Sequence, residues 1–135
     1  MGLAINFYLR SFTALLLLFN SCGALYGGWQ LITDPTGNKL GMPLSVLQYS
    51  PFDSFLMPGI ILFLANGVFG FIVLYLMFFR YKNYTLAIIA QGIILLGWII
   101  VQMLMLRTVN TLQLVMGLTG VLLLCLGYLM YRKAI

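Results

Sequence analysis

The sequence predicts an all-α integral membrane protein: four transmembrane helices in a compact bundle, both termini cytoplasmic, and a structured outer loop between helices one and two. Three observations predict this class. Of the 135 residues, 63% are hydrophobic and 7% are charged, whereas a soluble domain carries about 25% charged residues. Four apolar runs are long enough to cross a bilayer. Most basic residues lie on one side of these runs.

The four crossings are expected at residues 11–32, 55–79, 84–106 and 111–131, with an outer segment at 33–54. Each run contains no charged residue and exceeds the roughly 18 apolar residues that identify a membrane helix. Pro58 and Gly59 fall within the first turns of the second run, where we expect them to loosen or kink the helix. The chain is therefore expected to be one tetraspan membrane domain over residues 1–135.

The basic residues near the helix ends predict the orientation of the chain, whose net charge is +5. One side carries Arg10, Arg80, Lys82, Arg132 and Lys133, and the other carries Lys39 and Arg107. Since cytoplasmic segments are enriched in Lys and Arg, we expect both termini in the cytoplasm, and a bacterial inner (plasma) membrane as the location. The cytoplasmic basic residues are also expected to contact anionic lipid headgroups.

The chain lacks the groups on which most catalysis depends. It has no His and no Glu, and its carboxylate side chains are those of Asp34 and Asp53, whereas acid–base catalysis near neutral pH mostly uses His or a perturbed carboxylate. Cys22 and Cys125 are isolated in separate apolar runs, which does not match a zinc or redox motif. We therefore expect no catalytic residue, no metal, no cofactor and no nucleic-acid partner.

The outer segment carries turn and capping signals. Asp34-Pro35-Thr36-Gly37 predicts a type I turn in which the Asp34 carboxylate accepts hydrogen bonds from backbone N–H groups. Residues 43–49 favour a short helix at the membrane interface. Ser50 is the predicted N-cap of the second crossing, which places Asp53 near the positive end of the helix dipole.

Amides and glycines recur at helical spacing on one face of each crossing. They are Asn20, Gly23 and Gly27 in the first, Asn66 and Gly70 in the second, Gln91 and Gln102 in the third, and Gln113, Gly117, Gly120 and Gly127 in the fourth. Lipid cannot hydrogen-bond an amide, and glycine lets backbones approach closely. We therefore expect these faces to point inward or toward a partner. Depth along the helices predicts that Asn20 lies near Gln91, and Gln102 near Gln113.

The function that these features favour is helix–helix assembly without catalysis, as a homo-oligomer or as a subunit of a larger membrane complex. Two alternatives remain open. The inward amides would also suit a small channel or transporter for a neutral or anionic solute. Asp34 and Asp53 would suit a membrane enzyme that uses paired carboxylates. The expected partners are the lipid bilayer and either a second copy of the chain or another membrane protein.

Overall fold

A computed structural model describes residues 2–48, 50–106 and 111–133, and contains helices and turns with no strand among them. The long helices are α1 (Gly2–Thr33), α4 (Tyr84–Leu106) and α5 (Thr111–Lys133). Between α1 and α4, the chain forms α2 (Leu56–Ile61), the π-helix η3 (Leu62–Val68) and α3 (Phe69–Phe78), which follow one another without a break. Two short 3-10 helices, η1 (Asn38–Leu40) and η2 (Leu44–Leu47), precede α2.

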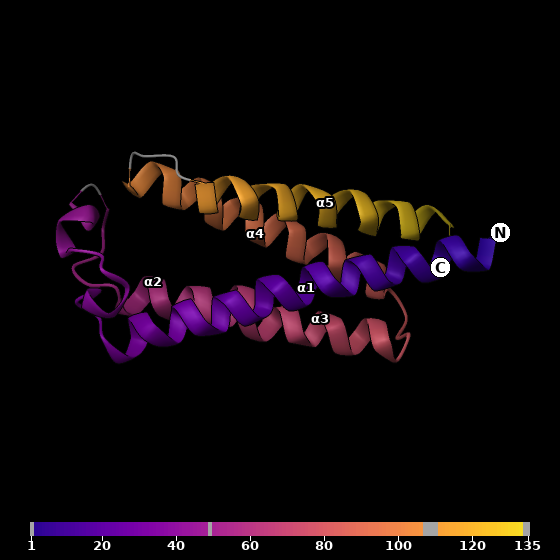
Figure 1. The fold of residues 1–135 in the computed structure, drawn as a ribbon, viewed down its shortest axis with the longest axis horizontal. Helices are drawn as coiled ribbons and strands as arrows, with labels where there is room; N and C mark the ends of the chain where they lie inside the picture. Colours follow the sequence, from indigo (N-terminus) through magenta and orange to yellow (C-terminus); the bar gives the residue numbers. More distant parts are fainter. Residues whose placement is uncertain (1, 49, 107–110, 134–135) are drawn as a thin grey trace.

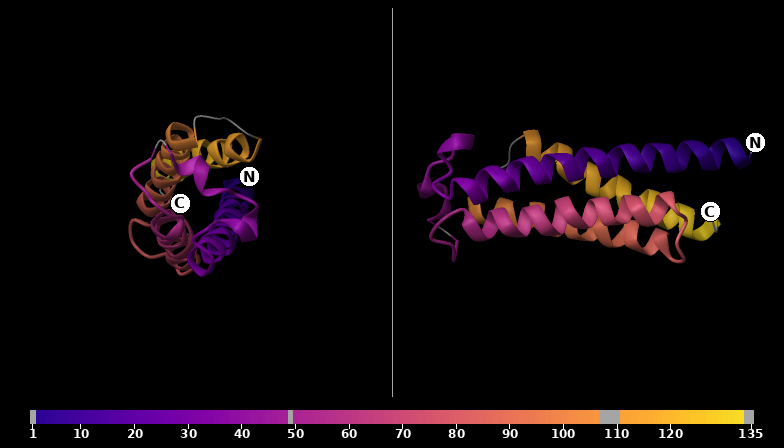
Figure 2. Two further views of the ribbon diagram at one scale, coloured as in Figure 1. Left: turned by 90° about the vertical axis from the view of Figure 1, so that its left-hand side faces the viewer. Right: turned by 90° about the horizontal axis from the view of Figure 1, so that it is seen from below.

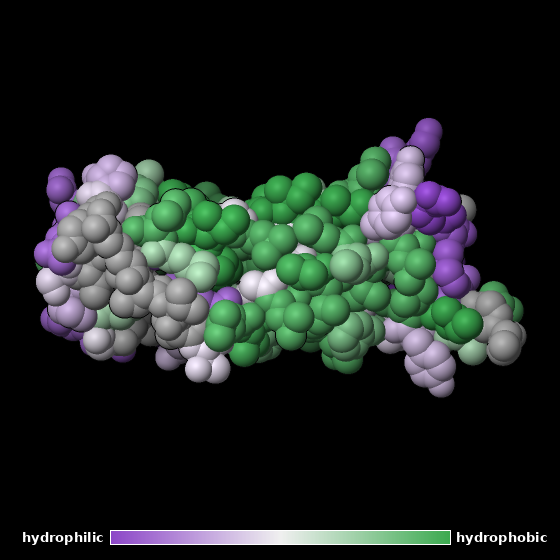
Figure 3. All heavy atoms as spheres, turned by 90° about the horizontal axis from the view of Figure 1, so that it is seen from above, coloured by the Kyte–Doolittle hydropathy of each residue, from purple (hydrophilic) through white to green (hydrophobic). Residues whose placement is uncertain are grey.

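These elements form an elongated bundle of four helices, each long and apolar enough to span a membrane. The first and last described residues lie at one end, here called the terminal end, and the segment between α1 and α2 lies at the other, the loop end (Figure 1). On the face shown in Figure 3, hydrophobic residues cover the middle of the bundle and hydrophilic residues gather at its two ends. That distribution matches a bundle with a hydrocarbon belt between two polar layers.

The bundle consists of two helix pairs. The helix α1 packs along α2, η3 and α3, and α4 packs along α5. In Figure 1 the two pairs lie closest toward the terminal end and diverge toward the loop end, and Figure 2 gives the end-on view. The buried core between them contains Leu17, Val73, Ile88, Leu95 and Leu123.

Glycine allows the close approach within each pair. A Cβ atom added to Gly28 of α1 would lie 2.9 Å from the carbonyl oxygen of Gly59 in α2. In the second pair, a Cβ atom on Gly92 would lie 3.0 Å from the carbonyl oxygen of Gly120. Any larger residue at Gly28 would therefore force the two backbones apart. Much of the glycine content that suggested assembly with a partner is thus used inside the chain.

The third helix has the predicted bounds, but the second begins later than its capping signals predict. Phe55 is only 3% exposed, packs with Leu31 and Leu47, and donates its N–H to the carbonyl of Pro35 at 2.9 Å. Because these contacts hold Phe55 in the loop, α2 starts only at Leu56. Ser50 is therefore not an N-cap, and its hydroxyl instead donates to the carbonyl of Leu47 at 2.9 Å.

Pro58, near which loosening or a kink was predicted, stands in the first turn of α2. There the missing N–H is one that has no acceptor within the helix, and the ring has no carbonyl of a preceding turn to clash with. The irregularity falls instead at η3, where the wider π-helical hydrogen-bond pattern accommodates an extra residue.

The outer turn is confirmed. The N–H of Gly37 donates to the carbonyl of Asp34 at 3.0 Å, and the Asp34 carboxylate accepts hydrogen bonds from the Thr36 hydroxyl and the Lys39 N–H. The predicted short helix is the 3-10 helix η2, which Pro43 precedes. Residue 49, Arg107 and the connection at residues 108–110 lie outside the described residues.

Candidate functional site

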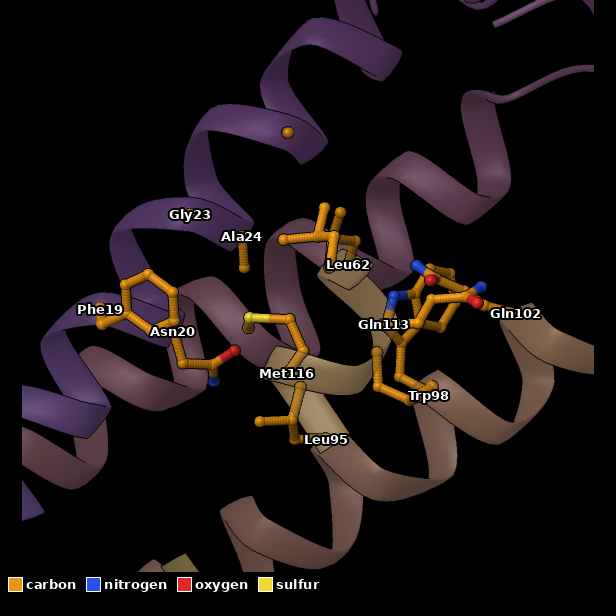
Figure 4. A pocket seen from close by; sticks show the side chains of 13 residues that line it. Phe19, Asn20, Gly23, Ala24, Leu62, Leu95, Trp98, Gln102, Gln113 and Met116 are labelled. Atoms are coloured by element: carbon orange, nitrogen blue, oxygen red, sulfur yellow. The ribbon is translucent and has the colours of Figure 1, made fainter. Parts of the chain in front are cut away.

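A cavity of about 280 Å³ opens where the two helix pairs diverge. Its walls come from α1, η3, α4 and α5 (Figure 4). The apolar part of the lining includes Phe19, Ala24, Leu62, Leu95, Ile99, Leu112 and Met116. Of the predicted site residues, Asn20, Gly23, Gly27, Gln102 and Gln113 line it as well. Residues from the predicted polar faces of the first, third and fourth crossings therefore line the same cavity.

Asn20 supplies the most unusual group in this wall. Its side chain is 1% exposed, and neither Nδ2 nor Oδ1 has a hydrogen-bond partner in the described part of the chain. In Figure 4 the amide projects from α1 toward Leu95 and Met116. The indole Nε1 of Trp98, a second lining residue, is also buried without a partner among the described residues. Buried polar atoms are rarely left unpaired in native proteins, so these atoms carry hydrogen-bonding capacity that the described chain does not use.

The two amides predicted to lie near each other at the loop end do share this site. Gln102 of α4 and Gln113 of α5 both line the cavity, as does Trp98 (Figure 4). The side chain of Gln113 is buried, and that of Gln102 is half-buried. Together with Asn20 of α1, these two amides of the α4–α5 pair give the cavity wall donors and acceptors from both helix pairs.

Gly23 and Gly27, spaced as a GxxxG pair, make room for the cavity instead of packing against a helix. A Cβ atom on Gly23 would meet no atom within 4 Å, and one on Gly27 would meet only Leu62 Cδ2, at 3.5 Å. The nearby rim residues Phe19 and Leu112 are 50% and 67% exposed. The cavity therefore reaches the outer surface of the bundle between α1 and α5.

Deeper in the core, Gln91 is paired differently from the prediction. Its Nε2 donates to Oδ1 of Asn66 over 3.1 Å, whereas both polar atoms of Asn20, the predicted neighbour of Gln91, have no partner in the described chain. The prediction compared depths along the helices, which does not determine which amides bond to each other. The acceptor Asn66 belongs to the π-helix η3.

Gly70 and Ser21 complete this inner cluster. A Cβ atom on Gly70 would collide with Ser21 Oγ and would lie 3.4 Å from Gln91 Oε1. Within the described residues, Ser21 Oγ, Asn66 Nδ2 and Gln91 Oε1 are buried without a partner. Ser21 was not among the predicted residues, because it is one residue from Asn20 and so off the polar face of the first crossing. A serine inside an apolar run was the available signal.

The remaining predicted residues lie elsewhere. Gly120 and Gly127 pack against α4, and Gly117 is half-buried with no atom within 4 Å of an added Cβ. Asp53 is exposed, three residues before α2 begins. The carboxylate of Asp34 is hydrogen-bonded within its own turn. The bond from the Thr36 hydroxyl has the largest effect, and with the bonds from the Lys39 N–H and the Thr36 N–H it holds the pKa of this carboxyl below its ordinary value. Neither aspartate lines the cavity.

The structure thus defines a helical bundle with four helices suited to a membrane and an internal, mainly apolar cavity. In the described part of the chain, no group of three or more His, Cys, Asp or Glu residues is placed to hold a metal ion. Comparison with protein-family models, with curated proteins and with solved structures finds no match to this chain.

Proposed function

We propose that this protein is a non-catalytic integral membrane protein that binds a small, uncharged, largely apolar molecule inside the bilayer, in the cavity between α1, η3, α4 and α5. The unpaired amide of Asn20 carries this proposal. An unsatisfied buried polar group costs about 1–3 kcal/mol, and Asn20 presents two such atoms. A bound molecule with a hydrogen-bonding group would satisfy them.

The chemistry of the wall supports a neutral ligand. None of the described residues that line the cavity is charged, so a charged ligand would be buried without a counterion. The lining is mainly apolar, with polar groups at a few positions such as Asn20 and Trp98, which is typical of sites for small molecules. A volume of about 280 Å³ suits a small molecule or the head of a longer one.

The position of the opening supports arrival from the lipid. The rim runs from Phe19, in the apolar middle of α1, to Leu112, the second residue of α5, and passes beside the open Gly23. In a bilayer the Phe19 side of this opening faces acyl chains. We further propose a bacterial inner membrane with both termini in the cytoplasm, since five basic residues flank the terminal-end side of the crossings and two flank the other side.

Quenching of Trp98 fluorescence by a long-chain bromoalkanol, a neutral molecule with one hydroxyl group, tests the proposal in nanodiscs. Trp29→Phe provides a background in which Trp98 is the single tryptophan. Gly23→Leu should fill the cavity without a backbone clash, and Gly97→Leu is the matched control, because Gly97 also meets no atom within 4 Å but lies outside the lining.

We expect saturable quenching in the background protein and in the Gly97→Leu variant, and its loss in the Gly23→Leu variant. Quenching that rises linearly with bromoalkanol in all three proteins would mean simple partition into lipid and would refute the site. Movement of the same alcohol between vesicles only when the protein is present would extend binding to transport, the alternative that the sequence left open.

Assembly is the second candidate function. Gly97 of α4 and Gly117 of α5 meet no neighbouring atom within 4 Å, so a helix of another chain has space to approach them. Mass measurement in nanodiscs tests it, and Gly117→Leu is expected to dissociate an oligomer that packs on Gly117. A strict monomer without a co-purifying protein would remove this candidate.

A further inference from the structure

A second cavity, of about 400 Å³, lies at the terminal end. The turn between α3 and α4 provides Arg80, Tyr81 and Lys82, the start of α4 provides Thr85, and the end of α5 provides Met130 and Tyr131. It is separate from the cavity around Asn20 and shares no lining residue with it. Its lining also differs chemically, because its polar groups include two cations and tyrosine hydroxyls, whereas the cavity around Asn20 has neutral amides.

The basic residues at this end have no acidic side chain with which to pair. The chain contains only two carboxylate side chains, those of Asp34 and Asp53, and both belong to the loop end. Arg10 is satisfied within the chain, because it donates to the Met77 carbonyl at 2.6 Å and to the Tyr84 hydroxyl at 2.8 Å. Arg132 donates to the hydroxyl of Tyr128 at 3.1 Å.

Arg80 and Lys82 differ from these two arginines, since their exposed side chains make no hydrogen bond or ion pair within the described chain. Both line the cavity. Two cations lining one cavity with no internal counterion in the described chain leave a positive potential there, which an external anion would neutralise.

The backbone holds the two cations in place. Arg80 ends α3 in the left-handed conformation (φ 54°), and a Schellman motif forms around it, with hydrogen bonds from Arg80 N to Met77 O at 3.2 Å and from Tyr81 N to Leu76 O at 3.0 Å. The Tyr81 ring stacks on the Tyr75 ring, with 5.7 Å between the ring centroids. Asn83, at φ 64°, closes the turn before α4. Glycine is the usual residue at such a helix end, so an arginine there places a charge at the cost of a less favourable backbone.

We propose that this cavity binds the phosphate group of an anionic phospholipid. A guanidinium and an ammonium group together suit a phosphate, the first by paired hydrogen bonds and the second as a point charge. Free phosphate offers the same chemistry. The lipid is favoured because the cavity lies at the terminal end of the bundle, between the apolar spans that end at Phe78 and begin at Tyr84, and because the buried apolar side chain of Met130 is part of its lining.

Native mass spectrometry of the full chain tests this, with titrations of phosphatidylglycerol, phosphatidylcholine and inorganic phosphate. The test variant is Arg80→Asn/Lys82→Gln, in which Asn keeps the left-handed conformation accessible. The matched control is Arg132→Gln/Lys133→Gln, which removes the same charge from the same end but outside the cavity lining. Arg80→Lys/Lys82→Arg keeps the charge and tests folding of the turn.

The wild-type chain should bind one phosphatidylglycerol about tenfold more tightly than phosphatidylcholine. The test variant should lose this preference, and the control and charge-keeping variants should retain most of it. Equal losses in the test and control variants would show diffuse attraction to the terminal end and would overturn the proposal. So would saturable binding of inorganic phosphate that displaces phosphatidylglycerol, since the ligand would then be a free anion, and so would a wild-type chain without preference.

Discussion

The side chain of Gln91 donates its Nε2 hydrogen to Oδ1 of Asn66 over 3.1 Å, in a core where both residues are fully buried. The bond joins α4 to the π-helical part of the second helix, and so links the two helix pairs. It is one of the few specific contacts between pairs that otherwise meet through apolar surfaces.

Replacement of Asn66 by Leu should destabilise the bundle, because Gln91 would lose its acceptor inside an apolar core. The coupling between the two residues should be about 1 kcal/mol, within the range of interhelical hydrogen bonds in membrane proteins. Unfolding free energies of Asn66→Leu, Gln91→Leu and the double variant in bicelles would measure it as a double-mutant cycle. Strictly additive effects would show that the bond contributes nothing.

Replacement of Asn20 by Leu should stabilise the bundle, in contrast to the replacement of Asn66. In the unliganded protein it removes two buried atoms that have no partner in the described chain, so we expect a gain of about 1 kcal/mol in unfolding free energy. The same variant should lose saturable bromoalkanol quenching, since the amide that anchors the hydroxyl is gone. A destabilisation as large as that of Asn66→Leu would contradict the assignment of Asn20 as a ligand-binding group.

Gly28 and Gly23 provide a matched test of helix packing in α1. An added Cβ at Gly28 would lie 2.8 Å from Phe63 Cβ and 2.9 Å from Gly59 O, whereas one at Gly23 would meet nothing within 4 Å. Gly28→Ala should therefore cost about 1–3 kcal/mol by overpacking. Gly23→Ala should gain up to about 1 kcal/mol through helix propensity. Thermal unfolding of the two variants in one detergent compares them directly, and equal midpoints would refute the close approach.

The number of helices was predictable because it depends on the lengths of uncharged apolar runs, which are local properties of the sequence. The bounds of α4 follow from the same rule. The start of α2 was not predictable, because it depends on the contact of Phe55 with Leu31 and Leu47 and on its bond to the carbonyl of Pro35. These residues are distant in sequence, so capping signals at Ser50 alone gave the wrong position.

The candidate site was predictable in part for a similar reason. Helical periodicity identifies which faces carry amides, and Asn20, Asn66 and Gln91 all lie buried. Periodicity does not identify partners, because it places Asn66 and Gln91 on inward faces without showing that they bond to each other. The cavity also has no sequence signal of its own. It exists because the helix pairs diverge beside Gly23, where the absent side chain leaves space.

The turn at the loop end should respond to acid. Hydrogen bonds from Thr36 and from the Lys39 N–H lower the pKa of Asp34 in the folded chain below its ordinary value of 3.8. The ionised carboxylate therefore stabilises the turn fully above about pH 3.8, and this contribution is lost as the pH falls below that value through the lowered pKa.

The carbon chemical shift of the Asp34 carboxyl, followed by NMR from pH 6 downward at roughly half-unit steps, measures the midpoint. Thr36→Val removes the hydroxyl that has the largest effect and should raise the midpoint toward 3.8, while Ser45→Ala, in the same loop but not bonded to Asp34, should leave it unchanged. A wild-type midpoint at or above 3.8 would contradict the hydrogen-bonded turn.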